Sequence, residues 1–379
     1  MPTTRAAEKA AATKGDDSKS EDKVTGSKHE TKHAKSPQAK RLKKNDDEKQ
    51  QTIEDTIPSS TREASESKEE PKPSAGEKNT AQDQIEKTDA AEKPGARQNV
   101  VPSSILEKGI IYFFFRGRVG IDEPSDVNEI QRSFMILRPL GKDAELGEGT
   151  IRDTGNIRLI AVPKKVFPRS GRDRWIAFVE KSDSSLKTIK EKFLSSSDYE
   201  TKTVGTRHSP AATPAAEGVF AITTTGRESH LVYMITLPSK LGEVQTELGL
   251  REKGSFIIST RNPQYHAPRG VAFSKGADYP KEVLDEFRGL RWIPSHPHHL
   301  DYVNTQFLLI GESSGIKKAT EPQKEDEKEG KEKPEDELET LEDEDAHRME
   351  VLKDDDSRAI FADLGVLAKG YPELKTTFE

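Results

Sequence analysis

The turn from Gly226 to His230 carries the densest run of chemically capable side chains in the sequence. An arginine, a glutamate, a serine and a histidine follow one another at residues 227–230. If this turn lines a pocket, Arg227 and His230 could hold an anion while Glu228 tunes the pKa of His230. Titratable residues of hairpins usually face solvent, so the alternative is a simple ion pair between Glu228 and Arg227. The turn is a candidate ligand pocket under the first interpretation and a solvated turn under the second.

A second group of imidazoles stands at His296, His298 and His299, with Asp301 close by. Three imidazoles and a carboxylate could bind Zn²⁺. Pro297 prevents the i, i+4 spacing of a helical site, and no second cluster of ligands accompanies the group. We therefore expect a surface turn here, with no bound metal and no other cofactor.

Residues 152–174 are rich in cations and contain only two acidic residues, Asp153 and Asp173. Such a density of positive charge could neutralise phosphates, and Trp175 follows directly and could stack on a base. Strand alternation would, however, spread these side chains over two faces, and no zinc finger, basic zipper or RNP-type aromatic pair accompanies them. The candidate phosphate or nucleic-acid contacts are Lys164, Lys165, Arg169, Arg172 and Arg174.

A compact basic cluster lies in the polar N-terminal region, just after Ser36 and Pro37. Its cations resemble a monopartite nuclear localisation signal, which an acidic groove of an import receptor would bind in extended form. The alternative is a solvated charge run in a disordered tail. The first interpretation predicts a nuclear protein with a nuclear import receptor as partner, through Lys40, Arg41, Lys43 and Lys44.

Other chemistries are excluded or weakened by what the sequence lacks. There is no cysteine, which excludes disulfides, thiolate catalysis and cysteine-containing zinc sites. Residues 311–315 match G-x-S-x-G, but a hydrolase needs an acid and then a histidine downstream, and the only later histidine is His347 in an acidic tail. No apolar run is long enough for a membrane helix, so we expect no membrane partner.

The elements that must position these residues lie between residues 102 and 313. Runs of apolar and β-branched residues predict strands, several of which stop at a proline. Helical spacing of apolar residues predicts three short helices, at 186–194, 241–248 and 280–287. We therefore predict one strand-rich α+β domain with about eight strands, at residues 110–115, 133–137, 156–162, 174–180, 218–224, 229–237, 254–260 and 306–310.

The flanks are too polar to form a core, in line with an overall composition of 31% hydrophobic and 34% charged residues. Residues 1–99 have almost no large apolar side chain and are predicted to be disordered. Residues 314–356 are strongly acidic and are predicted to be a disordered linker or, as the alternative, a marginally helical tail. Residues 357–379 carry Ile360, Phe361, Leu364 and Leu367 on one helical face, which predicts a short amphipathic helix that docks on its own core or in a partner's groove.

Three stretches of the chain are similar to a family of filamentous-fungal proteins labelled "BTB domain transcription factor". They are ILEKGIIYFFFRGRVG from Ile105, GRESHLVYMITLPSKLG from Gly226 and FRGLRWIPSHPHHLDY from Phe287. The resemblance spans residues 104–313 and the terminal SRAIFADLG segment. It implies a nuclear, transcription-associated role and brings no catalytic motif, and the helix pattern typical of a BTB domain is not found in the sequence.

These observations lead to two hypotheses of function. The first is a nuclear, non-enzymatic regulatory protein, transcription- or chromatin-associated, that acts by binding a protein partner or nucleic acid. The alternative is a small-ligand-binding protein or enzyme whose pocket is built around Arg227 and His230.

Overall fold

Eleven β-strands form the framework of the described chain. The computed structural model describes residues 100–202, 205–266, 275–353 and 356–378, so the prediction of disorder for residues 1–99 lies outside it. The strands are β1 Ile105–Gly117, β2 Ile130–Leu140, β3 Ile157–Val162, β4 Arg174–Ser184, β5 Ser197–Thr201, β6 Gly205–Ser209, β7 Thr213–Thr224, β8 Ser229–Leu237, β9 Lys253–Arg261, β10 Trp292–Pro294 and β11 Gln306–Gly311.

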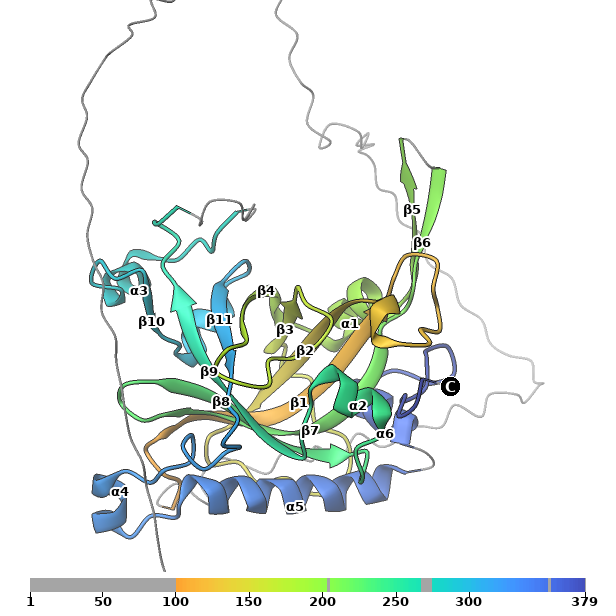
Figure 1. Ribbon diagram of the computed structural model, residues 1–379. Coiled ribbons are helices and arrows are strands. Elements are labelled where there is room, and N and C mark those ends of the chain that lie inside the picture. Colours follow the sequence, from red (N-terminus) through yellow and green to blue (C-terminus); the bar gives the residue numbers. More distant parts are fainter. Residues whose placement is uncertain (1–99, 203–204, 267–274, 354–355, 379) are drawn as a thin grey trace, which may run out of the picture. The chain divides into compact units, whose positions relative to one another are not determined.

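Eight of these strands close into an antiparallel barrel (Figure 1). The neighbours around the ring are β1, β2, β3, β4, β11, β9, β8 and β7, and β7 returns to β1. The closing pair is β8 with β9, whose register runs from Ser229 opposite Ile258 to Met234 opposite Lys253. The prediction of an α+β fold is therefore wrong, because the predicted strands form one closed sheet and the domain is closer to all-β.

Both faces of the barrel wall are buried along β1, β3, β7 and β8, which explains the continuous apolar runs in these strands. In β1, Phe113 and its alternate neighbours point into the barrel, whereas Tyr112 and Phe114 point outward into a second apolar cluster. Alternation of side chains along a strand puts successive residues on opposite faces, so burial of both faces removes the polar half of the pattern.

The barrel interior is filled by aromatic rings. The Phe113 ring meets the edges of Phe167 and Tyr233 at centroid distances of 5.2 and 5.1 Å, and Tyr233 stacks on Phe256 at 5.4 Å. Eight strands enclose a space just wide enough for side chains to fill. The interior is thus a packed core.

Helical segments surround the barrel. They are η1 Val127–Glu129, α1 Leu186–Ile189 with its π-helical continuation η2 Lys190–Leu194, α2 Glu243–Leu248, α3 Lys281–Glu286, η3 Pro297–Asp301, α4 Lys324–Glu329, α5 Pro334–Leu352 and α6 Asp356–Asp363. Figure 1 shows α5 as the longest helix, and it packs against the outer face of β7 and β8. None of the helices in the described residues is long and apolar enough to cross a membrane.

The acidic segment after the barrel is not the disordered linker expected from its composition. It forms α4 and α5, and α5 buries Leu338, Leu341 and Met349 against the outer apolar cluster. These apolar residues recur at helical spacing within an acidic run, so one face of the helix is buried while the acidic residues on the other meet solvent. The terminal amphipathic helix α6 docks beside it, with Ile360 and Phe361 fully buried.

Candidate functional site

The candidate phosphate contacts lie on or beside a loop that folds over one end of the barrel. This cap loop, residues 163–173, connects β3 to β4 and inserts Phe167 into the interior cluster. The Phe167 amide donates to the carbonyl of Leu248 at 2.7 Å. A Cβ atom on Gly311 would lie 2.4 Å from the amide nitrogen of Ser170, so only glycine permits this approach. The first glycine of the G-x-S-x-G match is thus required by packing.

Asp173, the only acidic residue of the cap loop, stabilises the loop by hydrogen bonds within it. The Asp173 carboxylate accepts hydrogen bonds from the amides of Arg169 and Ser170, at 3.1 and 3.0 Å, and from the Ser170 hydroxyl. These hydrogen bonds, led by the one from the Arg169 amide, lower the pKa of Asp173. The carboxylate is therefore held by the loop's own amides and hydroxyl, which keep it in place within the loop.

The five predicted phosphate contacts divide into two groups. Lys165 donates to the carbonyl of Asn128, and Arg169 donates to the carbonyls of Thr246 and Glu247 at the end of α2. Lys164, Arg172 and Arg174 are exposed. Arg174 makes only a local contact, to the carbonyl of Gly171 at 3.2 Å. Among the described residues, no hydrogen bond or ion pair holds the side chain of Lys164 or Arg172, so these two and Arg174 form the exposed basic group of the cap loop.

A further cation of the basic run at residues 152–174 does not belong to the exposed basic group. Arg158 is buried and pairs with Glu107 and Asp301, each at 2.6 Å. Although burial would lower it, the two carboxylates raise the pKa of Arg158. This arginine therefore stabilises the barrel and cannot contact a phosphate.

The turn after β7 does not bring the three residues of the predicted pocket together. Arg227 is exposed, Glu228 pairs with Lys318 near the surface, and His230 is completely buried. A shallow open depression lies beside the turn, but its lining is Thr225, Gly226 and residues 321–325. The structure thus sends the three side chains in different directions.

His230 is hydrogen-bonded to Glu312, a partner that was not predicted from the sequence. Its Nδ1 lies 2.8 Å from Oε2 of Glu312, and the Ser255 hydroxyl donates to the same oxygen at 2.7 Å. The serine thus contacts the carboxylate and not the imidazole. A nucleophilic triad requires a serine bonded to the histidine, so this buried group is structural.

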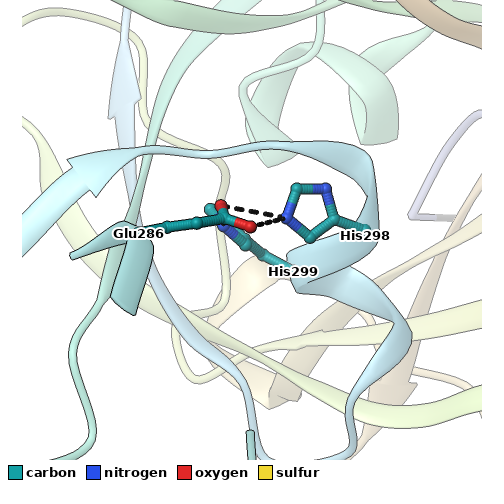
Figure 2. Close-up of side chains that lie close together, drawn as sticks. All are labelled: Glu286, His298 and His299. Atoms are coloured by element: carbon teal, nitrogen blue, oxygen red, sulfur yellow. Dashed lines mark hydrogen bonds and ion pairs between the residues drawn. The ribbon is translucent and has the colours of Figure 1, made fainter. Parts of the chain in front are cut away.

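The histidine cluster has a carboxylate partner, but from α3 and not from Asp301. Figure 2 shows both imidazoles directed at the Glu286 carboxylate, with Nε2 of His298 and Nε2 of His299 each 3.0 Å from one of its oxygens. Burial lowers the pKa of His299 to about 4. Burial would raise the pKa of Glu286, but hydrogen bonds from His299 and His298 lower it.

Two imidazoles and a carboxylate this close together could hold a metal ion. The hydrogen bonding of His299 argues against it. The main-chain N–H of His296 donates to Nδ1 of His299 at 3.1 Å, and a main-chain N–H is always a donor. The proton of the neutral ring must then be on Nε2, the atom that a metal would need, and it is donated to Glu286. The residues present do not fit a metal, and the group instead ties α3 to η3.

The largest cluster of charges was not anticipated from the sequence. Arg348 of α5 lies between three carboxylates, with its Nη1 2.7 Å from Asp363 of α6, its Nη2 3.1 Å from Glu217 of β7 and its Nε 3.2 Å from Asp345. All four side chains are completely buried. We call these residues, together with Arg138, the buried cluster.

Arg138 of β2 supplies the second guanidinium. It donates to the main-chain oxygen of Asp363 at 2.7 Å and lies 3.2 Å from the Asp363 carboxylate. The Tyr112 hydroxyl donates to the same carboxylate, and the Thr236 hydroxyl donates to Asp345 at 2.7 Å. The signal available in the sequence was the helical spacing of Leu338, Leu341, Asp345 and Arg348, hidden in an acidic run.

The predicted nuclear localisation residues, Lys40, Arg41, Lys43 and Lys44, lie outside the described residues. Comparisons with protein-family models, with curated proteins and with solved structures found no match to this chain.

Proposed function

We propose that this chain is a nuclear, non-enzymatic regulatory protein that binds nucleic acid through the exposed basic group of its cap loop. The observation that carries the proposal is the contrast within that loop. The Asp173 and Arg169 side chains are bonded to main-chain groups, while the exposed side chains of Lys164 and Arg172 have no bond to any described residue, and Arg174 at the start of β4 makes only its local one.

The support of the loop favours a binding role for these cations. Phe167 is inserted in the barrel core, and Arg251 donates to the carbonyl of Arg169 at 3.1 Å. A loop anchored in this way presents its charges with little loss of conformational freedom on binding. Cations held at fixed positions along a surface bind phosphates mainly by releasing counterions, which makes the binding sensitive to salt.

A binding experiment with the full-length chain tests this role. The parent and the triple variant Lys164→Gln, Arg172→Gln, Arg174→Gln are titrated into duplex and single-stranded pools at several salt concentrations. The triple variant should bind more weakly and lose about 0.9 in the slope of log K against log salt for each phosphate contact removed. The matched control replaces Lys187, Lys190 and Lys192, which are exposed on α1 and η2, with glutamine.

The control variant should bind as the parent does. Equal affinity of the parent and the cap-loop variant would contradict nucleic-acid binding at this loop. Nucleic-acid binding lost only on neutralising Lys40, Arg41, Lys43 and Lys44 would assign it to the N-terminal region.

Nuclear import is tested separately with a fluorescent fusion. Replacing Lys40, Arg41, Lys43 and Lys44 with alanine should move the fusion from the nucleus to the cytoplasm, because the receptor groove recognises their charges. An unchanged distribution would show that this cluster is not the signal.

A further inference from the structure

The buried cluster contains more negative than positive charge. Its carboxylates are Glu217, Asp345 and Asp363, and its guanidinium groups are Arg138 and Arg348. A further buried pair between β1 and α5, Lys108 with Glu337 at 2.7 Å, is balanced. An uncompensated charge in a dry interior is costly, and a titratable group there usually neutralises by binding a proton.

Two of the three carboxylates are bonded as ionised groups. Asp345 accepts from two nitrogens of Arg348 and from the Thr236 hydroxyl. Asp363 accepts from Arg348, Arg138, the Tyr112 hydroxyl and the Ile151 amide. Four donors fill the lone pairs of the Asp363 carboxylate, and two nitrogens of the Arg348 cation bond Asp345, so the donors of the cluster favour the ionised form of both aspartates.

Glu217 is bonded differently. Its Oε1 accepts one hydrogen bond from Arg348, and its Oε2 is buried with no hydrogen-bond partner in the part of the chain described. Burial, and then the charge of Asp345, raise the pKa of Glu217 well above its ordinary value. Burial also acts to raise the pKa of Asp363, but two of the four donors to its oxygens are guanidinium groups, which favour the ionised form and leave the proton of the cluster to Glu217.

We propose that docking of the C-terminal helices α5 and α6 on the barrel takes up one proton, which is held on Glu217. The C-terminal segment is then a latch that is tightest in acid and loosens as the pH rises. This inference concerns the outer face of β7 and does not depend on nucleic-acid binding. The charged and titratable groups around Glu217 are Tyr112, its cross-strand partner on β1, and Arg138 of β2 from the barrel, and Asp345, Arg348 and Asp363 from α5 and α6.

The direction of the pH effect follows from the raised pKa. Below the ordinary value of 4.5, Glu217 is protonated whether or not the helices are docked. Above that value, only the docked form keeps the proton, so the docking equilibrium falls by up to about tenfold for each pH unit. The fall ends at the raised pKa of docked Glu217, above which both forms are ionised.

Hydrogen exchange of the full chain measures the latch directly. Protection factors of the α5 and α6 amides should fall by up to about tenfold for each pH unit above pH 4.5, while those of β3 and β4 should not fall with them. In Glu217→Gln, a neutral amide that does not titrate replaces the protonated carboxyl. The fall in protection with rising pH should therefore disappear. The control is Glu339→Gln. Glu339 is an exposed residue of α5 that pairs with Lys253, so this variant should still lose protection as the pH rises.

If Glu217→Gln fails to fold, a spectroscopic measurement on the parent protein tests whether a glutamate holds the proton. With only glutamate side chains labelled with ¹³C, one carboxyl should remain protonated above about pH 6. Protection that is level with pH in the parent, or glutamate carboxyls that all titrate below about pH 5, would overturn the proposal. A fall that persists in Glu217→Gln would also overturn it, because the proton would then be held elsewhere.

Discussion

The buried cluster and the histidine cluster use ionisable groups in opposite surroundings. In the buried cluster, Arg348, Glu217 and their partners are completely enclosed between the barrel and the C-terminal helices. In the histidine cluster, His299 is buried, but Glu286 is 39% and His298 47% exposed. Water can stabilise charge in the second cluster and cannot reach the first.

This difference decides how each cluster responds to pH. The buried cluster must balance its own charge, so it keeps an acid protonated and loses stability as the pH rises. The histidine cluster keeps a buried imidazole neutral, because its charged form would be poorly solvated and Nδ1 already accepts a main-chain hydrogen bond. It loses stability as the pH falls. Two ionic groups of one domain thus oppose each other between acid and neutral pH.

The largest effect is expected from breaking the buried cluster. Arg348→Met leaves the Asp345 and Glu217 side chains without their guanidinium, which should lower the free energy of unfolding by about 3–5 kcal/mol. Denaturant titration at neutral pH measures it. The control, Lys253→Met, removes a half-exposed pair to Glu339 on the same helix and should cost less than about 1 kcal/mol.

A compensated variant sharpens the same test. Combining Arg348→Met with Asp345→Leu and Glu217→Leu leaves the balanced pair of Arg138 and Asp363 and should recover most of the lost stability. A loss for Arg348→Met as small as that for Lys253→Met would mean that the cluster is not closed to water.

The second effect is acid sensitivity at the histidine cluster. The pKa of His299 is about 4, below its ordinary 6.5, so its contribution is complete above pH 6.5 and is lost as the pH falls toward 4. That window corresponds to roughly 2–3 kcal/mol. His299→Gln should remove this loss, measured as the difference from the parent at each pH so that the contribution of Glu217 cancels. His298→Gln should retain it, and an equal loss in His299→Gln and the parent would exclude His299 as its source.

The smallest effect is expected from added Zn²⁺. Because Nε2 of His299 carries a proton, the ion should not raise the midpoint of thermal unfolding of the full chain. A rise that depends on Zn²⁺ concentration and is absent in Glu286→Gln would show that His299 changes tautomer and that the cluster binds metal.

The barrel strands and several short helices could be predicted from the sequence alone. Each of the eight predicted strands overlaps a barrel strand, from residues 110–115 in β1 to 306–310 in β11, and the predicted helices overlap α1, α2 and α3. Apolar runs, helical spacing and proline stops depend on nearby residues alone, so they can be recognised in one sequence. The exposure of Lys164 and Arg172 also agrees with the hydrophilic loop that separates two predicted strands.

Only the tertiary structure decided how these elements combine. Closure depends on β8 meeting β9 and on β11 entering between β9 and β4, and pairing between distant strands leaves no local mark in the sequence. The grouping of charges was decided in the same way. Asp345 and Arg348 appear as part of a solvated acidic run until Glu217, more than a hundred residues earlier, is brought against them. Composition reports how polar a segment is, but burial depends on what packs against it, and the fold alone determines that.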